Sequence, residues 1–247
     1  MAVPIHMLWI GPRLSTLERL AIASFQAHGH VVRLFTYGDV EGVPAGVERH
    51  DGREVLPASR VFTYASDFGK GSYAGFSDMF RYKLLLDHGG IWCDTDIVCL
   101  RPFEFAAEYV VARERLPPHA RAPAGSEKLN GCVLKAPRNS RVMLECYAIC
   151  TELDTNSLSW GDIGPDLVTK RFVRHRLEEH ALPPEIFCPI DWWEADKLVA
   201  RGAREPAGAH AVHFWNEVWH HNAMDKDATY PADSLYEILK RRYEVSV

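Results

Sequence analysis

The chain has 247 residues, of which 47% are hydrophobic and 25% are charged, and its formal net charge is −5 at pH 7. A chain of this length and apolar content can bury a substantial core, and one α/β domain suits it. The negative charge and the lack of any long basic run argue against a nucleic-acid-binding protein, which usually carries a basic patch. Because no run of 18 apolar residues occurs, the sequence predicts no transmembrane segment.

The cysteines and the first residues indicate the compartment. Six cysteines form no CxxC pair, and most of them lie in apolar runs, so we interpret them as small buried side chains in a reducing environment. The first six residues lack the charged region and the long apolar stretch of a signal peptide. We therefore expect a cytoplasmic location, with peripheral contact to the inner membrane as an alternative.

The first elements predict a βαβ unit. Residues 3–10 form an apolar run that ends at Gly11-Pro12, which predicts a strand and a turn. The tetrapeptide at 15–18, Ser-Thr-Leu-Glu, matches a capping box and predicts a helix that extends to about residue 28. Residues 31–37 predict the second strand. A strand, a helix and a strand at this spacing indicate a parallel sheet.

The rest of the chain shows alternating helix and strand signals after a turn-rich stretch at 38–74. The expected elements, in order, are a helix at 75–88 ended by Gly89-Gly90, a strand at 91–100 interrupted by acids, a loop at 114–128, a strand at 129–136, a helix at 140–150, a helix that begins at Gly164-Pro165, a strand at 209–215 and a helix at 233–243.

Two acids interrupt an apolar strand. Asp94 and Asp96 are flanked by residues 91–93 and 97–100, which are almost all apolar. In an extended chain, residues two apart point to the same side, so the two carboxylates would face one another in a buried setting. Like charges that close are unfavourable unless something neutralises them, and a divalent cation with oxygen ligands does so. The alternative is a surface turn with solvated acids.

The preceding helix carries one polar strip. Ser77, Asp78 and Arg81 lie within a narrow sector of a helix that is otherwise mostly apolar. Such a strip on a buried helix is expected to face a cavity. The alternative is a local ion pair that contributes roughly 0.3–0.5 kcal/mol and has no functional role.

The segment 76–96 as a whole has the pattern Ser-Asp-x-x-Arg-Tyr, then Gly-Gly, an aromatic residue and Asp-x-Asp. It resembles the sugar-binding region of DXD glycosyltransferases, which include yeast-type α-1,6-mannosyltransferases, α-1,4-galactosyltransferases, bacterial capsular polysaccharide enzymes and, distantly, the clostridial glucosylating toxins. Residues 5–11, Asn130-Gly131 and Gly164-Pro165 are also similar to motifs of this family, and so is a histidine, His213, six residues before Trp219.

One departure from the family pattern is clear. The family usually has a serine directly before that tryptophan, whereas this chain has Val218. This puts any hydroxyl contact to the donor phosphate at this position in doubt.

The resemblance implies a GT-A type, Rossmann-like nucleotide-binding fold with a mainly parallel central sheet in a single domain over 1–247. Residues 1–113 would form the nucleotide-binding half, and residues 129–247 the acceptor half. It also implies a UDP- or GDP-sugar donor, Mn²⁺ or Mg²⁺, retention of the anomeric configuration, and a hydroxyl acceptor on a saccharide, a lipid-linked saccharide or a protein. Synthesis of a bacterial surface polysaccharide or glycoconjugate is the expected setting.

The resemblance also assigns roles to the polar residues. Asp96 would bind the metal directly, Asp94 would hold the ribose and the metal shell, and His213 would be a further ligand. Asp78 and Arg81 would grip the hydroxyls of the transferred sugar, with Arg81 also balancing phosphate charge. Asp78, Arg81, Asp94 and Asp96 form the predicted catalytic set. A buried core histidine is the alternative interpretation of His213.

Further contacts are expected on both substrates. The other predicted donor-binding residues are Trp9, Ile10, Gly11, Asn130, Gly164 and Trp219. Trp9 would stack on the base, and Trp219 would lie on a loop that closes over the donor. The predicted acceptor residues are Asp166, Trp192 and Trp193, with Asp162 nearby. Plain packing is the alternative for the tryptophans.

Two other functions remain open. Metal-dependent phosphatases and phosphotransferases use an Asp-x-Asp pair, but they place it after the first strand, whereas here it follows about 90 residues. A non-catalytic module that binds a nucleotide sugar is the other alternative.

Overall fold

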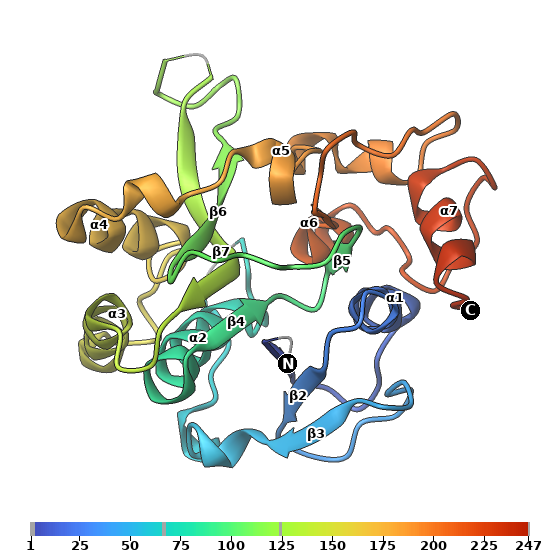
Figure 1. Cartoon of the computed structure of the whole chain (residues 1–247). Coiled ribbons are helices and arrows are strands. Elements are labelled where there is room, and N and C mark those ends of the chain that lie inside the picture. The colour runs from blue at the N-terminus through green and yellow to red at the C-terminus, as the bar shows by residue number, and fades with distance from the viewer. Residues whose placement is uncertain (1–2, 66–67, 124, 247) are drawn as a thin grey trace.

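The computed structural model describes residues 3–65, 68–123 and 125–246. Its centre is a six-stranded sheet with the order β3-β2-β1-β4-β7-β6 (Figure 1). The first four strands in this order are parallel, and β7 is antiparallel to both of its neighbours. The predicted α/β class with a mainly parallel sheet is therefore confirmed. The strands are β1 (Ile5–Trp9), β2 (Val32–Thr36), β3 (Glu48–Asp51), β4 (Gly90–Cys93), β6 (Val110–Arg115) and β7 (Glu127–Ala136).

A second, two-stranded sheet corrects the prediction of one strand over 91–100. After β4, Asp94 leaves the main sheet and the chain turns, with the Ile97 amide donating to the Asp94 carbonyl over 3.1 Å. The chain then forms β5 (Ile97–Cys99), which pairs antiparallel with β8 (Ala211–His213). The turn occurs because the fully buried β5 finds its partner in β8 rather than in the main sheet. The predicted strand at 209–215 is correspondingly shorter.

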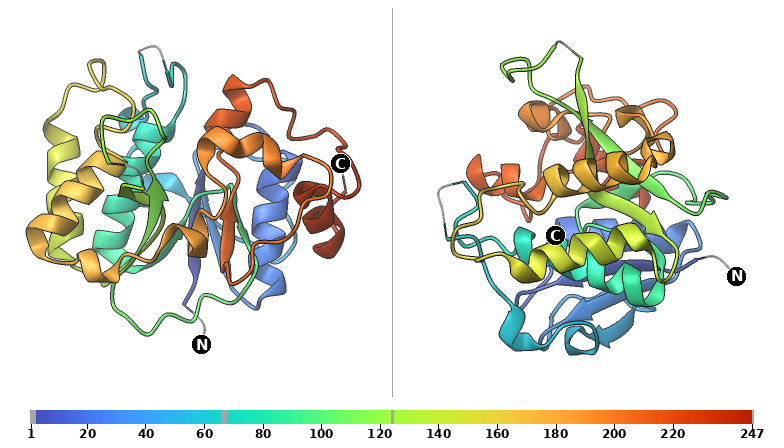
Figure 2. Two further views of the ribbon diagram at one scale, coloured as in Figure 1. Left: turned by 90° about the horizontal axis from the view of Figure 1, so that it is seen from above. Right: turned by 90° about the vertical axis from the view of Figure 1, so that its left-hand side faces the viewer.

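The helices form two layers, as the views in Figure 2 show. Helices α2, α3 and α4 cover one face of the sheet, and α1 and α7 lie on the other side. The predicted longer helices are confirmed, including the capping box at Ser15 and the proline in the first turn of α4. The helices are α1 (Thr16–Ala27), α2 (Ala74–His88), α3 (Arg141–Glu152), α4 (Pro165–His175), α5 (Pro184–Phe187), α6 (Asn216–His221) and α7 (Leu235–Arg242), with 3₁₀ turns η1 (Gly52–Glu54), η2 (Ala58–Arg60), η3 (Glu178–His180) and η4 (Trp192–Leu198).

Each layer encloses its own apolar core. One core contains Phe25 of α1, Tyr236 of α7 and Phe214, which follows β8. The other core contains Phe80 of α2 and Phe172 of α4. All six cysteines are free and buried, as the apolar runs around them predicted. Among the described residues, no helix has both the length and the apolar character needed to cross a bilayer.

The predicted loop at 114–128 is partly wrong. Residues 114 and 115 complete β6, residue 127 begins β7, and only the segment between them connects the two strands. The two strands form an antiparallel hairpin in which Glu114 is paired with Lys128. The charged side chains at 113–115 end the apolar run of residues 110–112, so the sequence pattern did not indicate that the strand continues through them.

Candidate active site

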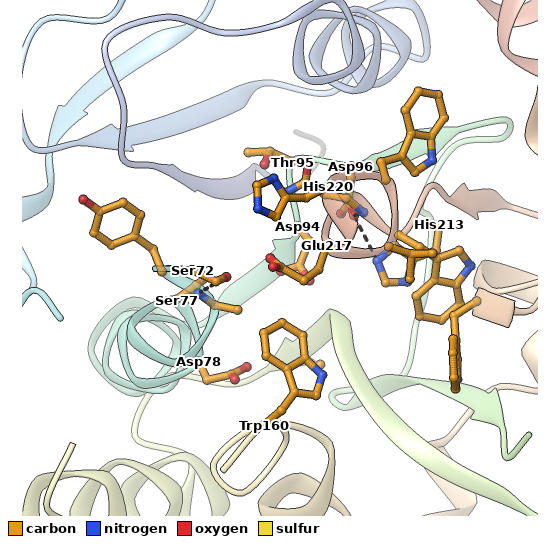
Figure 3. A pocket seen from close by; sticks show the side chains of 18 of the residues that line it. Ser72, Ser77, Asp78, Asp94, Thr95, Asp96, Trp160, His213, Glu217 and His220 are labelled. Carbon is orange, nitrogen blue, oxygen red and sulfur yellow. Dashed lines mark hydrogen bonds and ion pairs between the residues drawn. The ribbon is translucent and has the colours of Figure 1, made fainter. Parts of the chain in front are cut away.

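A cavity of about 1000 Å³ opens where β1 and β4 end, between α2, α6 and the β6–β7 hairpin. The ends of parallel strands are the usual place for ligands in an open α/β sheet. Ten of the predicted site residues line this cavity: Trp9, Ile10, Asp78, Arg81, Asp94, Asp96, Asn130, Trp192, His213 and Trp219. Figure 3 shows the side chains of Asp78, Asp94 and His213 around it, from α2, the turn after β4 and the end of β8.

The polar strip of α2 faces this cavity, as predicted. Arg81 is buried and its guanidinium joins two carboxylates: Nη1 lies 3.2 Å from Oδ1 of Asp78, and Nη2 lies 2.9 Å from Oδ1 of Asp94. The same guanidinium lies over the ring of Trp92, 5.1 Å from its centroid. Asp94 also accepts a hydrogen bond from Nε1 of Trp92 over 2.8 Å. The helix and the acidic turn are thus one hydrogen-bonded unit.

Two glycines make room for this unit. A Cβ atom at Gly131 would lie 2.3 Å from Nη1 of Arg81, and a Cβ atom at Gly164 would lie 2.7 Å from Oδ2 of Asp78. Both distances are far shorter than any normal carbon contact. Gly164 therefore borders Asp78 without lining the cavity, and Gly131 sets the position of Arg81.

Burial and neighbouring charges shift the pKa values of these groups. Burial raises the pKa of Asp78 to about 6, although the adjacent Arg81 opposes the shift. Burial also raises the pKa of Asp94, against the opposing effect of Arg81. Burial disfavours the charge of Arg81, but the carboxylates of Asp94 and Asp78 outweigh it and raise the pKa of the guanidinium further. Arg81 is therefore a fixed positive charge at the floor of the cavity.

Asp94, Asp96 and His213 could hold a metal ion. One ligand atom from each lies within 4.8 Å of the others. Oδ2 of Asp96 lies 3.2 Å from Nε2 of His213 and accepts a hydrogen bond from the Asn216 amide over 2.7 Å. Burial would raise the pKa of Asp96, but His213 and the amide outweigh it and lower that pKa. Two carboxylates and an imidazole fit a divalent cation such as Mn²⁺ or Mg²⁺.

The other ring nitrogen of His213 faces sulfur. Its Nδ1 lies 3.8 Å from Sγ of Cys188, which in turn lies 3.8 Å from Sγ of Cys132. Burial would lower the pKa of His213, but Asp96 outweighs burial and raises that pKa well above its usual value. The imidazole is thus oriented from both sides, with Nε2 turned toward the two aspartates.

The residues at the end of β1 border two hollows, and Ile10 lines both of them. Trp9 and Ile10 line the main cavity, and Lys226 lies over the ring of Trp9 at 5.4 Å from its centroid. Gly11 lies in a smaller hollow of about 240 Å³, together with Tyr37 and Asp39. The three residues therefore border adjoining spaces.

The predicted place of Trp219 on a closing loop is wrong. Trp219 lies in α6 and is fully buried, with its ring packed edge-on against Tyr236 at 5.2 Å between centroids. The loop is absent at this position because the segment 216–221 is helical and its tryptophan fits between Phe214 and Tyr230. Trp219 forms a cavity wall from within the core.

Only one of the predicted acceptor residues lines the cavity. Trp192 does so, whereas Trp193 packs against it edge-to-face at 5.4 Å between centroids, outside the lining residues. Asp166 and Asp162 are exposed on and beside α4, also outside the lining residues. Asp166 lies 3.8 Å from Nζ of Lys128, and Asp162 accepts a hydrogen bond from the Ser159 amide over 2.8 Å. Both aspartates thus make surface contacts around α4 rather than contacts in the cavity.

Several charged and aromatic residues of the cavity were not predicted. They are Glu114 and Lys128 of the hairpin, Trp160 before α4, Glu217 of α6 and Lys226 after it. No local sequence pattern marks them, because each reaches the cavity through long-range packing.

The chain is similar in sequence to a known family and to known enzymes. Residues 54–120 match the family described as glycosyltransferase sugar-binding region containing DXD motif. The chain is 29% identical over 157 residues to lactosylceramide 4-alpha-galactosyltransferase of Rattus norvegicus, which covers 57% of this chain and 40% of the relative. It is 28% identical over 182 residues to alpha-1,4-N-acetylglucosaminyltransferase of Homo sapiens, which covers 68% and 49%. The chain thus spans less than half the length of these two relatives.

A solved structure described as PaToxG glycosyltransferase has a similar fold. Its TM-score is 0.50 at 18% identity, and the match covers 72% of this chain and 71% of that one. The predicted GT-A type fold is confirmed by this likeness together with the strand order of the central sheet. The matched family segment contains Asp78, Arg81, Asp94 and Asp96. The chain therefore carries the sugar-binding region of the DXD glycosyltransferases, which confirms the resemblance predicted from its sequence.

Proposed function

We propose that the chain is a metal-dependent, retaining glycosyltransferase that moves a hexose from a UDP- or GDP-sugar onto a hydroxyl acceptor. The observation that carries the proposal is the position of Arg81, which joins Asp78 to Asp94 beside the Asp96–His213 pair in one cavity. A sugar and a diphosphate need hydroxyl-binding carboxylates and positive charge side by side, and this cavity supplies both.

Each group of cavity residues has a separate role in this reaction. Asp78 accepts hydrogen bonds from hydroxyls of the transferred sugar, and Arg81 balances the phosphate charge that develops as the sugar departs. Asp94, Asp96 and His213 hold Mn²⁺ or Mg²⁺, which when bound neutralises the diphosphate as a Lewis acid. Trp9, Ile10 and Gly11 contact the nucleoside at the end of β1, and Asn130 contacts the sugar. The walls formed by Trp160 and Trp219 restrict the access of water.

The relatives support the kind of product. Both are named for transfer that makes an α-1,4 linkage. An α-linked product is the outcome of retention when the donor is an α-linked nucleotide sugar. Saccharides, lipid-linked saccharides and protein hydroxyls are the acceptor classes that we propose. A cytoplasmic setting in the synthesis of a bacterial surface polysaccharide or glycoconjugate is part of the same proposal.

Calorimetry with UDP and with GDP, each with and without Mn²⁺, tests the donor side. We expect one nucleotide to bind, and to bind more tightly with Mn²⁺. Hydrolysis of the matching nucleotide sugar then tests turnover, and full activity in the presence of EDTA would contradict the metal claim. Binding without turnover on a broad acceptor panel would favour a non-catalytic module. Release of inorganic phosphate from a simple phosphoester would favour a phosphatase.

A further inference from the structure

The β6–β7 hairpin carries a buried carboxylate that lines the cavity. The side chain of Glu114 on β6 is 8% exposed and lines the cavity. Its Oε2 accepts a hydrogen bond from Nδ2 of Asn130 over 2.6 Å, and its Oε1 lies 3.4 Å from Nζ of Lys128. A carboxylate has about four acceptor positions, so these two contacts leave capacity for a ligand. Burying such a group is costly unless it is hydrogen-bonded.

Asn130 connects this carboxylate to the polar strip of α2. Its Oδ1 accepts a hydrogen bond from the Cys132 amide over 2.8 Å, which turns its amino group toward Glu114. The next residue, Gly131, packs directly under Arg81. Asn130, which contacts Glu114, and Gly131, which contacts Arg81, are consecutive residues of β7. They therefore lie between Glu114 and Arg81. Glu114 borders the space next to the one that we assign to the transferred sugar.

Trp192 lines the same cavity, and the residue before it is paired with the strand that carries Glu114. Successive residues of a strand point to opposite faces, so Arg115 points away from Glu114 and pairs with Asp191 over 3.0 Å. Nε1 of Trp215 donates a hydrogen bond to the Ile190 carbonyl over 2.9 Å. Residues 190 and 191 are thus fixed from two sides, and they hold Trp192 in the cavity.

We propose that Glu114, Lys128 and Trp192 form the subsite for a saccharide acceptor. Glu114 accepts a hydrogen bond from one sugar hydroxyl, Lys128 donates one to a neighbouring hydroxyl, and the Trp192 ring packs against the face of the sugar. The proposal rests on the proposed glycosyltransferase function and names the place at which its acceptor binds.

Binding of lactose, cellobiose and maltose tests the subsite, measured by saturation-transfer difference NMR with UDP or GDP and Mn²⁺ present. The variants are Glu114→Gln, which keeps an acceptor oxygen for Asn130 but removes the charge, Lys128→Met and Trp192→Ala. We expect wild-type protein to bind at least one disaccharide, and each variant to bind it about tenfold or more weakly, because a polar or aromatic partner is lost. Nucleotide affinity, measured by calorimetry on the same samples, stays unchanged.

Glu127→Gln is the matched control. Glu127 lies on the same hairpin and pairs with Arg113 over 3.5 Å, outside the residues that line the cavity. We expect this variant to bind the disaccharide as wild type does. Trp192→Ala leaves the Glu114–Lys128 pair intact, so it tests the subsite even if Glu114→Gln lowers the melting temperature.

Three outcomes would overturn the subsite: no disaccharide binds to wild type, Glu114→Gln binds as tightly as wild type, or Glu114→Gln weakens nucleotide binding instead. The last result would mean that Glu114 only positions Asn130 on the donor. Failure of the proposed function looks different, because wild type would then bind neither nucleotide. Disaccharide binding that still depended on Glu114 would keep the saccharide subsite without the transferase.

Discussion

Nη2 of Arg81 lies 2.9 Å from Oδ1 of Asp94, and this contact ties the polar strip of α2 to the acidic turn after β4. Both side chains are at least three-quarters buried. A planar guanidinium can reach Asp94 and Asp78 together because its nitrogens diverge in a fixed fork. The geometry of two carboxylates that line the cavity therefore depends on one arginine.

The first prediction follows from that dependence. Arg81→Lys keeps the positive charge but replaces the fork with a single ammonium, which cannot bridge both carboxylates in the same way. We expect donor turnover to fall by about 100-fold, because a displacement of about 1 Å in such a site has an effect of this size. Steady-state hydrolysis of the nucleotide sugar measures it.

Arg33→Lys is the control for this change. Arg33 makes a comparable 2.8 Å contact with Glu48, but that pair is exposed and joins β2 to β3 away from the cavity. Its variant is expected to retain wild-type turnover. Equal losses in both variants would show that the Arg81 contacts have no special role.

The parts of the site that could be predicted are local. The capping box at Ser15, the polar strip on α2 and the proline at the start of α4 follow from spacing within a single element, and the structure has all three. The convergence of Asp94 and Asp96 was also predicted, although the extended strand assumed for it was wrong. Their carboxylates converge because the chain turns between them.

The parts that could not be predicted depend on distant partners. Glu114 belongs to a strand that only its pairing with β7 defines, and its neighbours in the cavity come from residues 128, 130 and 192. The burial of Trp219 depends in the same way on Tyr236 of a helix that begins 16 residues later. Spacing within one element contains no information on such contacts.

The second prediction concerns the cation. Asp96→Asn replaces the carboxylate that we propose as a metal ligand with a neutral amide, while the size of the side chain and its contact with the Asn216 amide can be kept. We expect Mn²⁺ binding to weaken strongly, because anionic oxygens supply most of the attraction for a hard cation. Electron paramagnetic resonance of free Mn²⁺ during titration measures the affinity without any turnover.

Asp87→Asn serves as the comparison, since Asp87 pairs with Lys83 on α2 and does not line the cavity. It is expected to leave Mn²⁺ affinity unchanged. Wild-type Mn²⁺ affinity in the Asp96→Asn variant would remove Asp96 from the ligand set.

The third prediction tests the close approach at Gly131. In Gly131→Ala, the new Cβ would lie 2.3 Å from Nη1 of Arg81, so the guanidinium must move and its contacts with Asp78 and Asp94 are strained. We expect a loss of about 1–3 kcal/mol in the free energy of unfolding, which is typical of overpacking in a buried site. Urea denaturation followed by circular dichroism measures the change.

A double-mutant cycle identifies the cause. If the added methyl group acts through Arg81, then Gly131→Ala has a much smaller effect in an Arg81→Ala background, because the clashing group is gone. Additive effects of the two substitutions would contradict the close approach as the source of the strain.

The fourth prediction concerns stability at acidic pH. His6 lies on β1 and is 3% exposed, and burial lowers its pKa to about 4, with Arg33 and His88 adding repulsion. The folded protein therefore holds this imidazole neutral, whereas the unfolded chain binds its proton near pH 6.5. The contribution of the neutral His6 side chain to the free energy of unfolding is fully present above pH 6.5 and is lost as the pH falls toward 4. A shift of this size corresponds to about 3 kcal/mol at most.

Denaturant unfolding at a series of pH values between 7 and 4.5 measures this loss. His6→Gln removes the titrating group, so its free energy of unfolding is expected to fall less steeply with pH than that of wild type, whatever its value at pH 7. His119→Gln, at an exposed loop position, is expected to keep the wild-type slope. Equal slopes in wild type and His6→Gln would mean that the folded protein accepts a proton on His6 as readily as the unfolded chain does, against the burial of this side chain between Phe35 and the start of β4.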